Sequence, residues 1–383
     1  MEIWTDGTLV VQACEETGTV RVLRDSAVIG ESTAEHPLGR RTPLAVDTGA
    51  DRIWAGHRLQ EFRLSDMSSV ATHEGPVLRV AGLGDGRLAA VLPSADGVCR
   101  LAVGQPGRWE REVTLDDLGQ AVPGLAATGE HPFTRAIGGD PTLTVTEHGL
   151  VVADGRRGVV AHFTHDLEPL GLWHAGGADE TELTGYATAR GILVTARWAA
   201  RESHVGWLTP DGPEHLLNSY GAFAIPADDN RFWLVGDFEV ALVDHGGNTI
   251  TSASAGAGRV RAAHASGSSC TMSSTTSVRI ATATDEGIAV RKVDVGGLSD
   301  IAAVFDPDVE GDRSFYLSLL AAIAGCSVRH GYSSHRDEDN HLHILVQEIR
   351  PGMEQKVEKA LRTAGAIHVD TVDPARSPSC CRR

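Results

Sequence analysis

Histidine and acidic residues are concentrated in one stretch near the end of the chain, between Arg329 and His343. Five side chains in this stretch could bind a metal ion: His335, Asp337, Asp339, His341 and His343. His341 and His343 are two residues apart, so on a β-strand both imidazoles point to the same side of the sheet. Imidazole nitrogens and carboxylate oxygens suit Zn, Ni, Fe or Mn. The alternative is a solvated polar loop, because no fixed-spacing motif such as HExxH is present.

Two adjacent cysteines near the C-terminus, Cys380 and Cys381, form a second candidate. Thiolates bind soft metal ions such as Cu, and the two arginines that follow favour the thiolate form. A tail that folds back onto His341 and His343 would create a mixed nitrogen–sulfur site. The sequence therefore allows a bound transition metal (Zn, Ni, Fe or Cu), without requiring one. The alternative is a mobile tail whose thiols have no role.

Composition and charge restrict the classes of partner. The 383 residues carry a formal net charge of −17, whereas binding to nucleic acid or to an anionic membrane needs a basic surface. We therefore expect neither a nucleic-acid partner nor a membrane partner. Nothing approaches about 18 consecutive apolar residues, and the first residues lack the basic and apolar segments of a signal peptide. The sequence favours a cytoplasmic location.

The larger part of the chain repeats an apolar strand that runs into a polar or Asp/Gly-containing turn. The copies are Thr19–Asp25, Gln60–Asp66, Val98–Gly104, Val160–Asp166, Val205–Gly212, Val240–Gly247 and Ala289–Gly297. A repeat of about 45 residues with four short strands per unit is typical of the blades of a β-propeller. The pattern predicts a mainly β protein, with a seven-bladed β-propeller over residues 1–297.

Each blade is expected to contain an inner strand followed by a hairpin. The predicted inner strands are Thr42–Val46, Val77–Ala81, Thr142–Thr146, Leu183–Ala187, Ala222–Pro226 and Val260–Ala263. The predicted hairpins include Arg52–Ala55 with Leu59–Leu64, Arg231–Val235 with Glu239–Val243, and Arg279–Ala283 with Ile288–Val293. The strand Met1–Trp4 is expected to close the ring against the last blade. Residues 107–140 are expected to form an excursion from one face.

Two of these strands carry a resemblance. Asp51–Gly56 reads Asp-Arg-Ile-Trp-Ala-Gly and resembles the D-x-I/L-W-x-G strand of propeller repeats in bacterial sensor proteins. Asn230–Gly236 is similar, with one extra residue before its glycine. The resemblance implies a propeller fold. It covers a few residues in two or three blades, so it implies no particular activity. The bacterial source that we expect rests instead on composition, because only three lysines occur and arginine carries the rest of the positive charge, as GC-rich coding favours.

After residue 297 the pattern changes. The predicted elements are a strand at Asp300–Phe305, a helix at Ser314–Ala324, strands at Ser327–Tyr332 and His341–Ile349, a helix at Gly352–Thr363 and a strand at Ile367–Val372. The order βαββαβ over residues 298–373 resembles the ferredoxin-like fold, a small α+β domain. Residues 374–383 are expected to form a flexible tail. The candidate metal loop would then join the second and third strands of this domain.

Three functions fit the sequence, and it does not decide whether the protein is an enzyme. The first is a non-catalytic scaffold, or protein-interaction module, that binds a protein partner through a propeller face. The second is a metal-dependent enzyme or metal-binding protein that uses the His/Asp loop and the Cys-Cys tail. The third is a small-ligand sensor in the α+β domain. Charged residues in the hairpin loops could also line the mouth of the ring: Glu15, Glu16, His57, Asp96, Arg156, Arg157, Arg201, Glu202, Asp237, Asp285 and Glu286.

Overall fold

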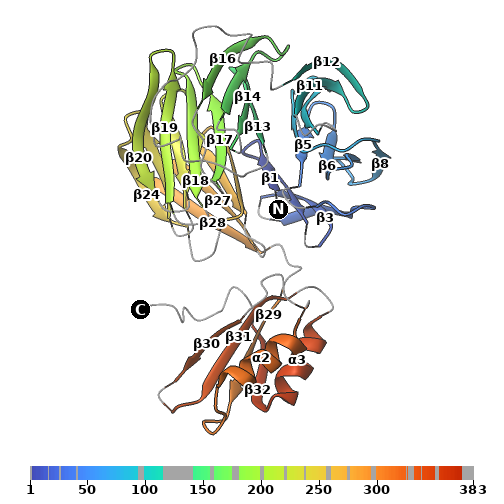
Figure 1. Ribbon diagram of the computed structural model, residues 1–383, viewed down its shortest axis with the longest axis vertical. Helices are drawn as coiled ribbons and strands as arrows, with labels where there is room; N and C mark the ends of the chain where they lie inside the picture. Colours follow the sequence, from blue (N-terminus) through green and yellow to red (C-terminus); the bar gives the residue numbers. More distant parts are fainter. Residues whose placement is uncertain are drawn as a thin grey trace. The chain divides into compact units, whose positions relative to one another are not determined.

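The computed structural model (Figure 1) describes residues 2–15, 17–25, 27–39, 42–93, 99–114, 141–155, 159–174, 181–198, 202–219, 222–236, 239–255, 260–273, 277–294, 299–324, 326, 332–337, 339–349 and 353–372. Contacts divide the chain into two compact units. Unit 1 comprises Met1–Ser274 and Arg279–Lys292, and unit 2 comprises Thr275–Val278 and Val293–Arg383. The predicted boundary at residue 297 and the predicted tail at 374–383 lie outside the described residues.

The first four sheets of unit 1, blades 1 to 4, each contain four consecutive antiparallel strands. Blade 1 contains β1 (Glu2–Thr5), β2 (Leu9–Cys14), β3 (Thr19–Arg24) and β4 (Ala27–Thr33). Blade 2 contains β5 (Leu44–Asp47), β6 (Arg52–Ala55), β7 (Gln60–Arg63) and β8 (Ser69–Thr72). Blade 3 contains β9 (Arg79–Gly82), β10 (Leu88–Leu92), β11 (Arg100–Gln105) and β12 (Arg108–Thr114). Blade 4 contains β13 (Thr142–Thr146), β14 (Gly149–Asp154), β15 (Val159–Phe163) and β16 (Pro169–His174).

Three further sheets have the same order of strands. Blade 5 contains β17 (Thr181–Ala187), β18 (Ile192–Trp198), β19 (Glu202–Thr209) and β20 (Gly212–Ser219). Blade 6 contains β21 (Phe223–Pro226), β22 (Arg231–Val235), β23 (Glu239–Asp244) and β24 (Thr249–Ser254). Blade 7 contains β25 (Ala262–Ser266), β26 (Ser269–Ser273), β27 (Ser277–Thr284) and β28 (Gly287–Asp294).

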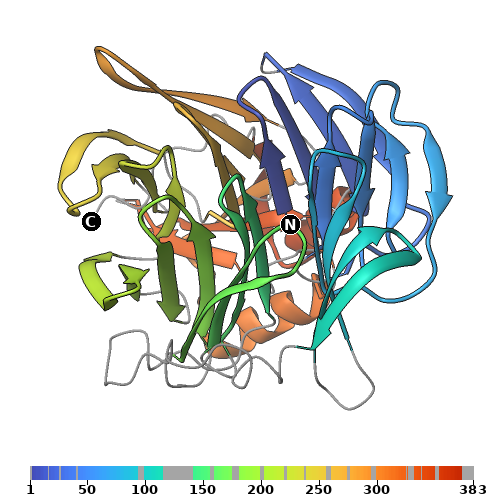
Figure 2. The ribbon, with the colours of Figure 1, turned by 90° about the horizontal axis from the view of Figure 1, so that it is seen from above.

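The seven sheets of unit 1 form a closed ring. Neighbouring blades contact each other all the way round, and β25 of blade 7 contacts β1 of blade 1. Figure 2 shows the sheets, coloured blue to orange, around a common centre. Unit 1 is therefore a β-propeller, as its repeats predict.

The inner strands of neighbouring blades run in the same direction. Three threonines of β13 each donate a hydroxyl hydrogen bond to a carbonyl of β17: Thr142 to Leu183 (2.7 Å), Thr144 to Gly185, and Thr146 to Ala187 (2.9 Å). The constant offset between these partners shows that the two strands are parallel. The starts of the inner strands therefore lie at one end of the ring.

The core of the propeller lies between blades rather than within one sheet. Hydrophobic clusters span the junctions of blades 1 and 2, 2 and 3, 3 and 4, 4 and 5, 5 and 6, and 6 and 7. Because each middle strand is covered on both faces, β10 is buried at every position, and β22 and β23 are buried at most positions. The outermost strands alternate instead, as β24 does.

Blade 7 differs from the prediction. The predicted hairpin at Arg279–Ala283 and Ile288–Val293 is present, but its strands are the third and fourth of the blade. The second strand is β26, which reads Ser-Cys-Thr-Met-Ser and is fully buried. Because most residues of β26 are small and polar, an apolar pattern in the sequence does not reveal this strand. Asp285 and Glu286 were predicted to lie with the other charged hairpin loops at one mouth of the ring. They connect the third and fourth strands of blade 7, so they lie at the opposite end of the blade from the loops that connect second and third strands.

The first strand, β1, pairs with β2 as the inner strand of blade 1 and contacts β25 of blade 7, so it closes the ring against the last blade as predicted. It reaches blade 7 through a hydrogen bond from the Thr5 amide to Nδ1 of His264 (3.3 Å). The predicted excursion at 107–140 begins with β12, the fourth strand of blade 3, and residues 115–140 lie outside the described residues.

Unit 2 contains one sheet and two described helices. Its elements are β29 (Ser299–Phe305), α2 (Arg313–Ala322), β30 (Tyr332–Arg336), β31 (Leu342–Ile349), α3 (Glu354–Thr363) and β32 (Ala366–Val372). The predicted succession of strands and helices is confirmed, and the antiparallel sheet has the order β30-β31-β29-β32. Leu342, Ile344 and Val346 are buried in one cluster with residues of both helices. None of the described helices is long and apolar enough to cross a membrane.

The second strand of unit 2 lies later than predicted. The prediction placed it at Ser327–Tyr332 and placed His335 in a loop, whereas β30 covers Tyr332–Arg336. Its sequence, Tyr-Ser-Ser-His-Arg, is polar because β30 is an edge strand of the sheet and needs only backbone pairing with β31. The loop between the two strands is therefore much shorter than the sequence indicates.

Candidate functional sites

The predicted metal-binding stretch forms a tight turn between β30 and β31. Asp337 is its centre: one carboxylate oxygen, Oδ1, accepts hydrogen bonds from the backbone amides of Asp339 (3.1 Å) and His341 (2.8 Å). The other oxygen, Oδ2, lies 2.8 Å from Nε2 of His343. The hydrogen bond from His343 holds the pKa of the Asp337 carboxyl below its usual value, with a further contribution from the His341 amide. The aspartate therefore stays ionised and stabilises the turn.

The two histidines lie as predicted on the sheet face opposite the helices. His341 and His343 flank Leu342, which is buried, and both approach Asp337, with Nδ1 of His341 at 3.5 Å from Oδ1. Their side chains and that of Asp337 are each about one-third exposed. The two histidines therefore share one carboxylate neighbour, and their role as metal ligands stays a prediction.

The remaining predicted ligands do not complete a metal site in the described part of the chain. His335 is paired with His343 through the backbone register of β30 and β31. Asp339 contributes its amide to the turn. Cys380 and Cys381 lie outside the described residues. Within the described ranges, no three His, Cys, Asp or Glu side chains are placed to hold one ion.

A pocket at the centre of the propeller, here called the axial pocket, is lined by inner strands of all seven blades. Its volume is about 220 Å³, and its ionisable lining residues are Glu2, Arg79, Glu182, Tyr186, Arg261 and His264. None of these was predicted as a site residue. Each belongs to an ordinary strand or strand start, and only the closed ring brings them together.

Burial keeps two groups of the axial pocket uncharged. Desolvation lowers the pKa of His264 to about 4, so its imidazole is neutral near pH 7. Its Nδ1 accepts the Thr5 amide, which places the proton on Nε2. Desolvation, with the nearby charges of Glu2 and Glu182, raises the pKa of Tyr186. Neither residue exchanges a proton readily near neutral pH.

One end of the propeller is acidic. The connections between first and second strands and between third and fourth strands share this end, here called the turn face. Every blade contributes exposed carboxylates to it: Asp6, Asp25, Asp66, Asp85, Glu147, Asp166, Glu168, Asp211, Asp228, Asp229, Asp285 and Glu286. Several arginines near this end are paired, as Arg87 is with Asp85 (2.8 Å) and Arg231 with Asp228 (2.6 Å). The turn face therefore carries an excess of negative charge.

Hydrogen bonds between blades hold the turn face in place. Oδ2 of Asp47 in blade 2 accepts from the Gly86 amide of blade 3 (2.8 Å). Oδ1 of Asp229 in blade 6 accepts from the Ala189 amide of blade 5 (3.2 Å) and lies 3.0 Å from Nε2 of His148 in blade 4. These contacts fix the positions of turns that belong to different sheets. The carboxylates therefore form a preorganised surface.

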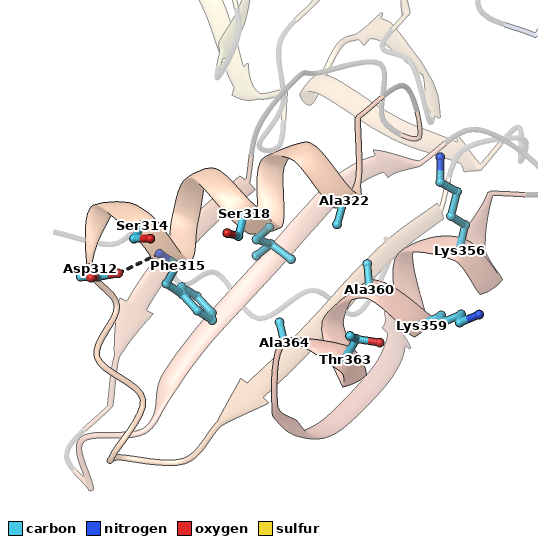
Figure 3. Close-up of a pocket in the computed structure, with 11 residues that line it drawn as sticks. Asp312, Ser314, Phe315, Ser318, Ala322, Lys356, Lys359, Ala360, Thr363 and Ala364 are labelled. Carbon is cyan, nitrogen blue, oxygen red and sulfur yellow. Dashed lines mark hydrogen bonds between the residues drawn. The ribbon is translucent and has the colours of Figure 1, made fainter.

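Unit 2 has an open groove between its two helices, shown in Figure 3. Its volume is about 610 Å³. Ser318 and Ala322 of α2, Ala360 of α3 and Ala364, which directly follows α3, line it, and the small size of these side chains leaves the space between the helices. The two lysines of α3, Lys356 and Lys359, add positive charge to one wall.

The blades define the class of this protein as a β-propeller with an additional α+β unit. No family model matches the chain, and no curated protein matches it. Similar solved structures include Hsv2 of Kluyveromyces lactis, at 9% identity over 77% of this chain and 98% of that chain, with a TM-score of 0.46. BBS1N in complex with ARL6DN has 13% identity over 75% and 88% of the two chains (TM-score 0.43). The dihydro-heme d1 dehydrogenase NirN in complex with DHE has 13% identity over 79% and 67% (TM-score 0.43).

Proposed function

We propose that this protein is a non-catalytic interaction scaffold whose propeller binds a basic protein partner through the turn face. The observation that supports this function is the ring of exposed carboxylates contributed by all seven blades, held in place by hydrogen bonds between blades. A fixed surface of one charge sign steers an oppositely charged partner and selects against acidic ones. A propeller gives such a surface because its turns converge at one end of a rigid ring.

The state of the axial pocket favours binding over catalysis. General acid–base catalysis works best with a group whose pKa lies near the working pH. Burial moves the pKa of His264 down to about 4 and moves that of Tyr186 upward, so both leave that range. The pocket groups therefore offer hydrogen bonds and charge rather than proton transfer.

The test is affinity capture from a native lysate with three forms of the protein. The first form is the unmodified chain. The second carries Glu147→Lys, Asp211→Lys and Glu286→Lys, which reverse exposed charges in blades 4, 5 and 7. The control carries the same number of reversals in unit 2: Asp308→Lys, Glu310→Lys and Glu358→Lys.

A basic protein captured in near-stoichiometric amount by the unmodified and control forms, and lost from the turn-face variant, supports the proposal. Capture should weaken as salt rises from low to physiological ionic strength, because exposed charges are screened. Recovery of the same protein by all three forms, or of no stoichiometric partner at any salt concentration, contradicts it.

A metal-binding function is the second candidate, because His341 and His343 both approach Asp337. An ion there would replace the hydrogen bond between His343 and Asp337 and would take further ligands from Cys380 and Cys381. Metal content measured by mass spectrometry, on the intact chain and on one lacking residues 379–383, tests this function. Near-stoichiometric metal lost on truncation would support a site shared with the tail. Metal absent from both forms would remove this candidate.

We also propose that unit 2 is a ferredoxin-like domain. Its strand and helix order is βαββαβ, and its edge strands β30 and β32 flank the central β31 and β29. Such a unit could act as a small-ligand sensor, and the groove between α2 and α3 gives a ligand space to occupy. Screening metabolites for thermal stabilisation of the Ala360→Trp variant against the unmodified chain tests this role, because the indole would fill the groove.

A further inference from the structure

The ionisable residues of the axial pocket follow an order around the ring. Glu2 is the first residue of β1, Arg79 the first of β9, Glu182 the second of β17, and Arg261 directly precedes β25. Because the inner strands run in one direction, these four side chains lie at the same end of the pocket. Read around the ring from blade 1 to blade 7, they alternate as acid, base, acid and base.

From this arrangement we propose that the axial pocket binds a small zwitterion, a molecule of amino-acid size that carries one ammonium and one carboxylate group. The carboxylate would contact the guanidinium groups of Arg79 and Arg261, and the ammonium would contact Glu2 and Glu182. A ligand with one charge would match only one of the two signs of charge that line this half-buried end of the pocket. A zwitterion compensates both.

The two sides of the pocket are built differently. Glu182 forms an ion pair with Arg197, whose guanidinium lies 3.5 Å from its carboxylate. The same guanidinium stacks at 4.0 Å on the ring of Phe223. Nη1 of Arg197 is buried without a hydrogen-bond partner among the described residues. On the other side, no described side chain pairs with the guanidinium of Arg261. Arg261 is therefore the cation best placed to receive a ligand carboxylate.

Further along the inner strands the pocket offers neutral groups. His264 is held neutral and presents an Nε2–H donor, and Tyr186 keeps its hydroxyl proton. The ring of Trp4 lies 6.2 Å from that of His264 and adds an apolar wall. Charge recognition is thus confined to one end of the pocket, and the rest accepts a small side chain. The volume of about 220 Å³ limits the ligand to a compact molecule.

Three matched probes separate a zwitterion from its single charges. L-alanine carries both groups, propionate lacks the ammonium, and ethylamine lacks the carboxylate. Glycine, L-leucine, L-glutamate and L-arginine extend the zwitterion series. Binding is measured on the full chain by thermal shift and by calorimetry at constant ionic strength, because a ligand that binds the folded state raises the melting temperature.

We expect at least one amino acid to bind about tenfold or more tightly than propionate and ethylamine, because each of these two compounds lacks one of the charged contacts. Arg261→Gln and Glu182→Gln should each weaken that binding about tenfold. Arg190→Gln, which removes an exposed arginine paired with Glu214 on the turn face, should leave it unchanged.

Three results would overturn the proposal. Propionate that binds as tightly as the best amino acid would make the pocket an anion site, and binding by none of the probes would remove the site altogether. Both comparisons use the unmodified chain, so they hold even if a variant fails to fold. Amino-acid binding that survives both pocket substitutions would place the ligand elsewhere and would also overturn the assignment.

Discussion

Two tryptophans in equivalent strands should differ in their contribution to stability. Trp54 in β6 and Trp233 in β22 occupy the second strands of blades 2 and 6, within the two similar sequence segments. Both are buried, at 3% and 0% exposure. Nε1 of Trp233 donates to the carbonyl of Gly267 in blade 7 (3.1 Å), whereas Nε1 of Trp54 is buried with no hydrogen-bond partner among the described residues.

Replacement by phenylalanine separates the hydrogen bond from the packing. Trp54→Phe and Trp233→Phe remove the same atoms from similar buried positions, so the packing cost should be alike. Trp233→Phe also removes a hydrogen bond worth about 1 kcal/mol, and Trp54→Phe relieves an unsatisfied N–H that costs about 1–3 kcal/mol. We expect Trp233→Phe to lower the free energy of unfolding by about 2–4 kcal/mol more than Trp54→Phe does.

The measurement is urea unfolding followed by far-ultraviolet circular dichroism, with both changes confined to unit 1. Midpoints are compared at unchanged slope, so that the difference reports stability rather than a change in exposed surface. Equal losses would show that the indole bond to Gly267 adds nothing measurable. A larger loss for Trp54→Phe would refute the reasoning, because it would mean that Trp54 has the stronger polar contact.

Further predictions concern the blade contacts, the axial pocket and the His/Asp turn. Gly82→Ala places a Cβ 2.7 Å from the Val46 carbonyl oxygen of blade 2 and should cost about 1–3 kcal/mol in urea unfolding, whereas Gly246→Ala, with only ordinary contacts at 3.4 Å, should cost much less. Because the pKa of His264 is about 4 when folded and 6.5 ordinarily, the unfolded chain takes up the proton first. Stability should fall by about 1–3 kcal/mol as pH drops from 6.5 to 4, and His264→Gln should reduce that loss. The Asp337 carboxyl has a pKa below 3.8, so its stabilisation of the turn is complete above that pH and is lost only as pH falls through the lower value. An NMR titration of Asp337 with a midpoint at or above 3.8 would contradict this.

The sequence by itself determined the strands wherever an apolar pattern was strong. Arg52–Ala55 and Arg231–Val235 were predicted with the bounds that the structure has. The prediction failed at β26 and β30, whose sequences are rich in serine. Burial of β26 comes from neighbouring blades, and β30 is held by pairing with β31, so neither requires a local apolar pattern.

The candidate sites divide in the same way. The spacing of His341 and His343 was sufficient to predict a shared sheet face, because the alternation of a strand is a local property. The axial pocket was not predictable, because Glu2 and Arg261 belong to blades at opposite ends of the chain. Only closure of the ring brings these residues to one pocket. The hydrogen-bond partner of the Trp233 indole is likewise set by the turn of blade 7 that lies beside it.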